Sequence, residues 1–284
     1  MKPILKVINL SKIYGVGCPK CYEMTGPDFD TNICSHCGSL VACSNVSFEL
    51  HIGEILGIVG ESGSGKSTVI KLINFDINPT AGEAYLVDDE ILKDFPELKG
   101  KNLFLLNSYQ KRKIKNILIG IVYQNPYIGL NMEISAGGNI AEKLIMANWT
   151  KFAYIRKRSS ELLAKTEFPI YRMDEPPKNF SGGMQQRVQI AKALANNPKI
   201  ILLDEVTTGL DVSVQARVLD LIRNIHRELK ISMILVSHDL RVINLLAERT
   251  IVMKYGKIVE IGLTDQILFD PQHYYTQLLV NSQI

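Results

Sequence analysis

The chain has 284 residues, 46% of them hydrophobic, which is enough to bury one large core or a core with a subdomain. A formal net charge of +3 is too small to favour nucleic acid, so we expect no nucleic-acid partner. No apolar stretch approaches the roughly 18 residues of a membrane span, and residues 1–10 do not read as a signal peptide. We therefore expect a cytoplasmic protein that would reach a membrane only through a partner.

Short apolar segments with strand character recur along the chain. Residues 55–59 form an apolar run bounded by glycines, as in a buried parallel strand, and residues 46–50 alternate as a half-buried strand does. The remaining expected strands are at 5–9, 117–123, 199–203 and 231–236.

Helices are expected between these strands. Apolar residues at helical spacing predict one helix over 67–74 and two more over 140–147 and 153–166. Strands that alternate with helices predict an α/β protein with a doubly wound, mostly parallel sheet, into which residues 125–185 insert a helical subdomain. The stretch 88–115 is polar and irregular, and we expect a loop extension there.

The most specific motif spans residues 60–67, which match the pattern G-x-x-x-x-G-K-[ST] between a predicted strand and a predicted helix. Glycines let backbone N–H groups wrap phosphates, Lys66 reaches the outer phosphates, and Ser67 takes Mg²⁺. The pattern predicts a P-loop for ATP and Mg²⁺. Its binding residues are Gly60, Ser62, Gly63, Gly65, Lys66, Ser67 and Thr68.

Three polar residues stand at the ends of apolar strands, where they could take part in the hydrolysis of a bound phosphate chain. Asp204 ends one strand and is placed to support the Mg²⁺ shell through the water network of Ser67. Glu205 follows and is the natural general base for the attacking water, while His238, after another strand, is expected to contact the γ-phosphate. We predict an ATPase that converts ATP and water to ADP and phosphate, with Glu205, His238 and Lys66 as catalytic residues.

These motifs, in this order and with Ser181-Gly182-Gly183-Met184-Gln185, resemble the ATP-binding cassette (ABC) family of P-loop NTPases. The resemblance covers residues 4 to 284 and implies one ABC ATPase domain over 1–284. It implies that Ser181, Gly182, Gly183 and Gln185 contact the γ-phosphate of ATP held by a second copy. The chain would then work as a head-to-tail homodimer with ATP at the interface.

The same resemblance assigns further residues. Gln124 matches the glutamine that senses Mg²⁺ and couples the helical subdomain, Asp211 belongs to a D-loop-like segment, and Tyr14 matches the aromatic that stacks on adenine. Val206 departs from the pattern, because the family has proline after the glutamate. Glu205 itself is present, so we expect the departure to affect the turnover rate rather than the chemistry.

The branch of the family depends on other segments. Residues 134–140, Ile-Ser-Ala-Gly-Gly-Asn-Ile, are similar to the ATPase subunits of carbon–phosphorus lyase systems, which dock on a soluble lyase core complex and couple ATP turnover to phosphonate breakdown. Residues 209–217 and 271–279 are shared with oligopeptide and nickel importer ATPases, whose partner is a membrane permease. A third alternative is an activator of another metalloenzyme, such as methyl-coenzyme M reductase.

A cysteine-rich insert at residues 18–38 sets the chain apart from an ordinary cassette. Cys18 and Cys21 form one CxxC pair, and Cys34 and Cys37 form another, so four thiolates could complete a tetrahedral site in a small zinc ribbon. Zn²⁺ is the expected ligand, with an iron–sulfur cluster and a redox or unliganded loop as the alternatives. We expect Cys43 to be a buried strand residue, and His36 not to be a ligand.

The position of the insert suggests a role. Removing residues 15 to 40 would bring Tyr14 close to Val41, so we expect a finger on a hairpin beside the adenine pocket. So small a ribbon cannot bury a core of its own, and metal binding must hold it together. Its expected task is contact with a partner, and the alternative is a stabilising decoration.

Overall fold

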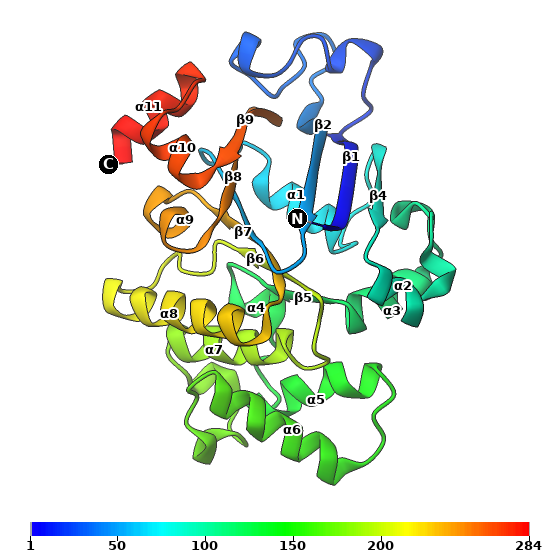
Figure 1. Ribbon diagram of the computed structural model, residues 1–284, viewed down its shortest axis with the longest axis vertical. Helices are drawn as coiled ribbons and strands as arrows, with labels where there is room; N and C mark the ends of the chain where they lie inside the picture. The colour runs from blue at the N-terminus through cyan, green and yellow to red at the C-terminus, as the bar shows by residue number, and fades with distance from the viewer. Residues whose placement is uncertain (1, 284) are drawn as a thin grey trace. The chain divides into compact units, whose positions relative to one another are not determined.

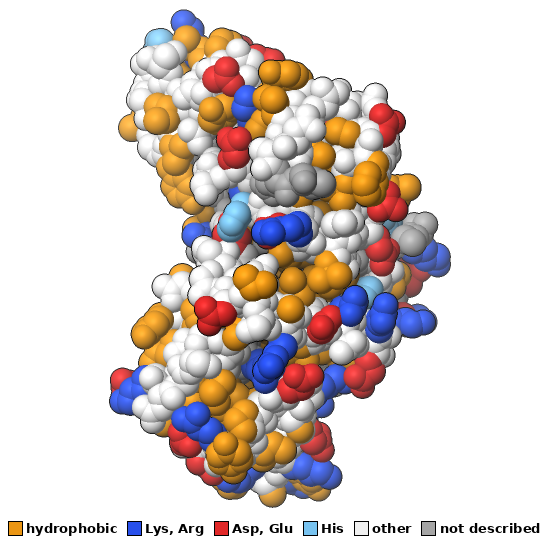
Figure 2. Space-filling view, turned by 90° about the vertical axis from the view of Figure 1, so that its left-hand side faces the viewer, with side chains coloured by type: hydrophobic (Ala, Val, Ile, Leu, Met, Phe, Trp, Pro, Cys, Tyr) orange, Lys and Arg blue, Asp and Glu red, His pale blue; other side chains and the backbone are white. Residues whose placement is uncertain are grey.

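The computed structural model describes residues 2–283, and it divides into two compact units. The first contains the described parts of 1–107 and 232–284, and the second contains residues 108–231. Among the described residues, no helix combines the length and the apolar character needed to cross a membrane. On the face shown in Figure 2, basic and acidic side chains are interspersed.

The first unit holds an antiparallel sheet that the sequence did not predict. Its strands are β2 (Leu40–His51), β1 (Pro3–Tyr14) and β4 (Ala81–Leu86), in that order. Strands β1 and β2 pair along their whole length, from Pro3 opposite His51 to Tyr14 opposite Leu40. This pairing makes both strands longer than the short segments expected at 5–9 and 46–50.

The first unit also holds two of the predicted parallel strands, and a parallel strand, β8, that the sequence did not predict. Strand β3 (Ile55–Val59) lies between β7 (Ser232–Ser237) and β8 (Arg249–Lys254) and runs parallel to both, and β9 (Lys257–Leu263) is antiparallel to β8. Every residue of β3 and β7 is buried. The helices of this unit are α1 (Lys66–Ile73), α2 (Asp89–Asp94), α9 (Leu240–Leu246), α10 (Thr264–Phe269) and α11 (Tyr274–Gln283).

The second unit is mainly helical. Its two strands, β5 (Ile119–Val122) and β6 (Ile200–Asp204), are parallel. Helix α7 packs against α5, α6 and α8 (Figure 1). The helices of this unit are α3 (Ser108–Ile117), α4 (Pro126–Gly129), α5 (Ala136–Met146), α6 (Phe152–Lys165), α7 (Gly182–Ala193) and α8 (Val212–Leu229).

The expectation of a loop over 88–115 is wrong. The Asp88 carboxylate caps α2 by accepting the N–H of Ile91, and two more acidic residues favour the first turn of that helix. Helix α3 buries only Ile114, so the sequence carries too few apolar positions to reveal a helical period. The domain limits expected at 18–38 and 125–185 stay predictions.

Candidate functional site

The predicted nucleotide residues are divided between the two units. The first unit contains Tyr14, residues 60–68 and His238, and the second contains Gln124, residues 181–185, Asp204, Glu205 and Asp211. Each group is described within its own unit.

Residues 60–67 join β3 to α1 in a loop. Two positions of this loop, 60 and 65, accept only glycine. A Cβ atom on Gly60 would lie 2.2 Å from the carbonyl oxygen of Met253, and one on Gly65 would lie 2.2 Å from that of Ala42. Both glycines also have positive φ, at 154° and 102°. The loop therefore lies against its neighbouring strands with bare backbone, which is the form that a phosphate cradle requires.

Lys66 lies inside this loop. Its side chain is 4% exposed, and its Nζ donates hydrogen bonds to the carbonyl oxygens of Gly60 and Glu61, at 2.7 and 2.8 Å. A third bond runs to Ser64 Oγ, at 3.3 Å. A buried ammonium group surrounded by backbone at the start of a helix favours an anion at this position.

His238 lies beside the same loop. Strands β3 and β7 are parallel, and Val59 pairs with Ser237, so the next residues, Gly60 and His238, emerge from the same edge of the sheet. His238 is exposed. Contact of His238 with the γ-phosphate stays a prediction.

Tyr14 ends β1, and 40% of its surface is exposed. Lys12 Nζ lies 5.1 Å from the centroid of its ring. An exposed ring can stack on a flat ligand, and stacking of Tyr14 on adenine stays a prediction.

In the second unit, the ends of β5 and β6 bring two predicted residues together. Val122 pairs with Leu203, so the residues after them leave the sheet at the same edge. Gln124 Nε2 donates to Glu205 Oε2 at 3.3 Å, and Thr208 Oγ1 donates to the same oxygen at 3.2 Å. Glu205 has a left-handed backbone, with φ of 46°. These bonds orient the carboxylate that we predict to be the general base.

The signature residues begin α7 with two exposed positions, Ser181 and Gly182. Gly183 is buried, and a Cβ there would lie 2.4 Å from Val214 Cγ1 of α8. Gln185 turns back, and its Nε2 donates to the carbonyl oxygen of Pro177 at 2.9 Å. The helix start is thus open to an outside group at Ser181, whereas Gly183 serves close helix packing.

The sequence did not predict a pair of buried glutamines on α7. Gln186 Nε2 donates to the carbonyl oxygen of Val206 at 2.8 Å, and Gln186 Oε1 accepts from Gln189 Nε2 at 2.8 Å. Gln189 in turn accepts the N–H of Tyr123 at 3.1 Å. This relay joins the residue before Gln124 to the residue after Glu205.

Replacing Gln186 with Leu is therefore expected to destabilise the second unit. The buried carbonyl of Val206 would lose its donor, which costs roughly 1–3 kcal/mol of unfolding free energy. The urea midpoint reports the loss, and Gln215→Leu on α8, outside the relay, serves as the control. Equal midpoints for the two variants would show that the relay contributes no stability.

The four predicted metal ligands meet in the first unit. Sγ–Sγ distances are 3.7 Å for Cys18–Cys34, 3.7 Å for Cys18–Cys21 and 3.5 Å for Cys21–Cys37, and all four sulfur atoms lie within 4.8 Å of one another. A tetrahedral ion with bonds of about 2.3 Å would separate its sulfur ligands by about 3.8 Å. The cysteines therefore fit one four-coordinate ion.

The surroundings of these thiols differ. Burial raises the pKa of Cys21 to about 12, whereas hydrogen bonding by Ser39 lowers the pKa of Cys37 to about 6. A bound cation would hold the buried sulfur as a thiolate. Cys43 is buried in β2, outside the group, as expected, and burial raises its pKa to about 12.

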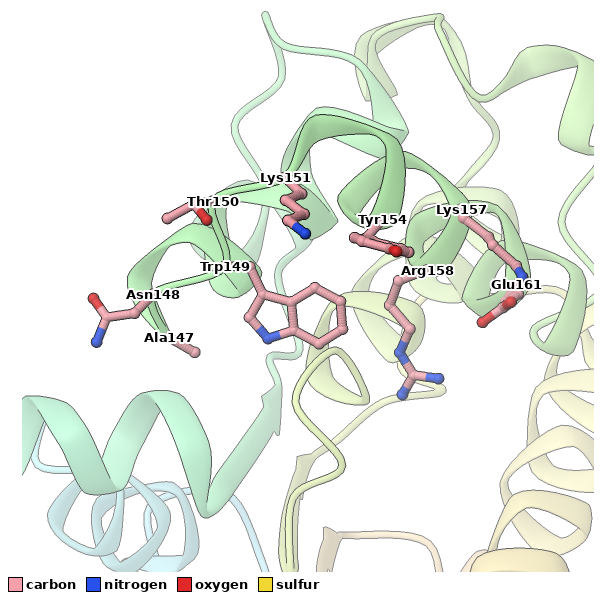
Figure 3. Close-up of a pocket in the computed structure, with 9 residues that line it drawn as sticks. All are labelled: Ala147, Asn148, Trp149, Thr150, Lys151, Tyr154, Lys157, Arg158 and Glu161. Carbon is pink, nitrogen blue, oxygen red and sulfur yellow. The ribbon is translucent and has the colours of Figure 1, made fainter.

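A separate hollow of about 670 Å³ lies in the second unit, where α5 is followed by α6. Trp149 and Arg158 project to the same side of this connection (Figure 3). Arg158 also donates to Asn197 Oδ1 at 2.6 Å. None of the predicted nucleotide residues lines this hollow.

Comparison with known proteins gives consistent matches. A family model described as ABC transporter matches residues 43–208. The phosphonates utilization ATP-binding protein PhnK of Escherichia coli is 46% identical over 281 residues, which are 99% of this chain and 98% of PhnK. The oligopeptide transport ATP-binding protein OppD of Bacillus subtilis is 40% identical over 247 residues, 86% of this chain and 67% of OppD.

The dimeric structure of the ATP-binding cassette MJ0796 bound to ADP and Pi has a TM-score of 0.73 with this structure, at 30% identity. The likeness covers 92% of this chain and 98% of that one. The matched family segment contains the phosphate loop, Gln124, the signature residues and Glu205. The expected α/β P-loop fold is confirmed, and the chain belongs to the ABC transporter family as one of its ATP-binding, ATP-hydrolysing cassettes.

Proposed function

We propose that two copies of the chain pair head to tail and hold two ATP molecules at their interface. The dimeric MJ0796 cassette supports this arrangement. The exposed start of α7 at Ser181 and Gly182 also supports it, because a helix N-terminus favours a phosphate. Each γ-phosphate would then contact the signature residues of the other copy.

Within each site, the backbone of 60–67 and Lys66 bind the phosphates, and Tyr14 stacks on adenine. The bare backbone at Gly60 and Gly65 fits a phosphate chain, because a Cβ at either place would collide with a carbonyl oxygen. Bound Mg²⁺ would neutralise charge between the outer phosphates.

The magnesium would be held by Ser67, Gln124 and Asp204. Glu205 takes a proton from the attacking water while the oxygen of that water bonds to the γ-phosphorus. The bond between the γ-phosphorus and the oxygen that bridges the β- and γ-phosphates breaks, and ADP leaves. His238 steadies the γ-phosphate.

We further propose that the chain couples ATP hydrolysis to a soluble carbon–phosphorus lyase complex in the cytoplasm. The observation that carries this proposal is the 46% identity with PhnK over almost the whole of both chains. The segment 134–140 adds to it, as does the exposed apolar surface of Tyr127 and Ile128 after Gln124. A hollow of about 190 Å³ beside this surface, lined in part by Tyr123 and Met146, would accept an apolar side chain of the partner.

Co-purification tests this proposal. When a tagged chain is expressed in its native host and purified without detergent, soluble lyase subunits should be recovered with it. A Tyr127→Ser, Ile128→Ser double variant should lose them, whereas Tyr171→Ser, a change at another exposed tyrosine of the second unit, should retain them. Recovery of integral membrane permeases without lyase subunits would support the importer alternative, which the 40% identity with OppD favours.

We also propose that the four cysteines bind one Zn²⁺. Three Sγ–Sγ distances of 3.5 to 3.7 Å, with all four sulfur atoms within 4.8 Å of one another, support a single ion rather than a larger iron–sulfur cluster. Elemental analysis of the purified chain should find about one zinc per chain. The double variant Cys21→Ser, Cys34→Ser should contain no zinc, whereas Cys43→Ser should keep its zinc.

A further inference from the structure

The loop between the two cysteine pairs reaches the phosphate loop directly. Asn32 Nδ2 donates a hydrogen bond to the carbonyl oxygen of Gly63 at 3.2 Å. Because a peptide unit is planar, holding this carbonyl also restrains the Ser64 N–H in the same unit, which donates to the carbonyl oxygen of Glu61 at 3.1 Å. Asn32 therefore orients one of the peptides that we propose to surround the phosphates.

A second contact runs through Lys254, at the end of β8. Lys254 Nζ donates to Asp30 Oδ1 at 2.8 Å and lies 5.1 Å from the ring centroid of Tyr275. The Tyr275 hydroxyl accepts the N–H of Glu61 at 3.1 Å. The insert thus contacts the phosphate loop directly at Gly63 and through two side chains at Glu61.

The insert has little apolar packing to hold Asp30 and Asn32 in place. Its buried hydrophobic residues are Cys21 and Cys34, which pack on Val41 with a few half-buried neighbours, and Thr25 and Gly26 are also buried. Backbone bonds help, including that from Val41 N–H to the carbonyl oxygen of Asn32 at 2.7 Å. A segment of this size buries too little surface to stay ordered alone, so an ion on Cys34, two residues beyond Asn32, would fix the loop.

We propose that metal occupancy of the four-cysteine site sets the nucleotide affinity of the phosphate loop, with Asn32 and Asp30 carrying the coupling. This inference rests on the proposed zinc site. With zinc bound, the insert holds the loop in its binding shape, so that the nucleotide does not have to order it. Because coupling between two binding events is reciprocal, bound nucleotide should tighten zinc binding by the same factor. The insert is in this view an internal regulator.

The experiment measures ADP binding with Mg²⁺ by calorimetry on the full chain, since ADP avoids turnover. The samples are zinc-loaded protein, protein stripped by a chelator selective for zinc over magnesium, and zinc-loaded Asn32→Ala and Asp30→Ala. Asp28→Ala is the matched control, because Asp28 is an exposed aspartate of the same loop. Zinc content is measured for every sample.

Asn32→Ala should keep its zinc and bind ADP roughly threefold to tenfold more weakly, the range expected for one hydrogen bond. Stripping the zinc should weaken binding at least as much, and Asp30→Ala somewhat less, because its ion pair is solvent-exposed. Asp28→Ala should bind as the wild type does. Saturating ADP should lower the zinc dissociation constant by the factor that stripping costs in ADP affinity.

Three results would overturn parts of this scheme. A chain that binds no metal rejects the zinc site itself. A chain that binds zinc, but whose ADP affinity is unchanged by stripping and by Asn32→Ala, rejects the coupling and leaves the zinc site standing. If stripping weakens ADP binding while Asn32→Ala and Asp30→Ala bind normally, the coupling does not use these contacts and the proposed route is wrong.

Discussion

Replacing Glu205 with Gln is expected to abolish ATP turnover while ATP still binds. Glutamine keeps the shape of the side chain, and the donors Gln124 and Thr208 still have an oxygen to contact. It cannot accept the proton of the attacking water, however, and a general base contributes about 10²- to 10⁴-fold to such a step. We expect turnover to fall by at least about 10²-fold.

Steady-state phosphate release and calorimetry with ATP measure the two halves of this prediction. Since hydrolysis would open the proposed dimer, the variant should also accumulate as a dimer with ATP, which light scattering detects. Glu161→Gln, at an exposed glutamate of α6, should behave as the wild type in all three assays. Turnover retained by Glu205→Gln would refute Glu205 as the base.

Replacing Lys66 with Ala is expected to remove most of the nucleotide affinity. The substitution deletes the charge that we propose to bind the outer phosphates, and it takes the donor away from the carbonyls of Gly60 and Glu61. Hydrogen bonds to charged groups contribute about 1.5–3 kcal/mol, so the loss should be about 10- to 150-fold in affinity.

Thermal unfolding with and without ADP gives an independent measure, because a ligand at 100 times its Kd stabilises the folded state by about 2.7 kcal/mol. At that concentration Lys66→Ala should keep only about 0.3 to 1.4 kcal/mol of this stabilisation, given the expected loss of affinity. Lys71→Ala, at an exposed lysine later in α1, is the control. Nucleotide affinity that stays the same in Lys66→Ala would remove residues 60–67 as the phosphate site.

The parts of the fold that the sequence predicted well have strong local requirements. The sequence predicts strand β3 with its observed bounds, because five buried residues, four of them aliphatic, suit a central parallel strand. The start of α1 followed from the phosphate-loop pattern. The limits of β1 and β2 depend on their mutual pairing, which no local pattern of 5–9 or 46–50 displays.

The relay of Gln186 and Gln189 could not be predicted for a different reason. Buried glutamines on a helix look unfavourable in a sequence, because their cost depends on partners. Here the partners of Gln189 and Gln186 are backbone groups of Tyr123 and Val206, 66 and 20 residues away along the chain. The contact of Asn32 with Gly63 is hidden in the same way, since only folding brings the cysteine insert to the phosphate loop.

Position 205 makes opposite demands on stability and on activity, because its backbone is left-handed. This conformation costs a residue other than glycine about 1 kcal/mol of folding free energy. Selection for a more robust fold alone would favour Gly or Asn there, whereas the proposed hydrolysis requires a carboxylate. Directed evolution of this protein for heat resistance, without an activity screen, would therefore tend to inactivate it at Glu205.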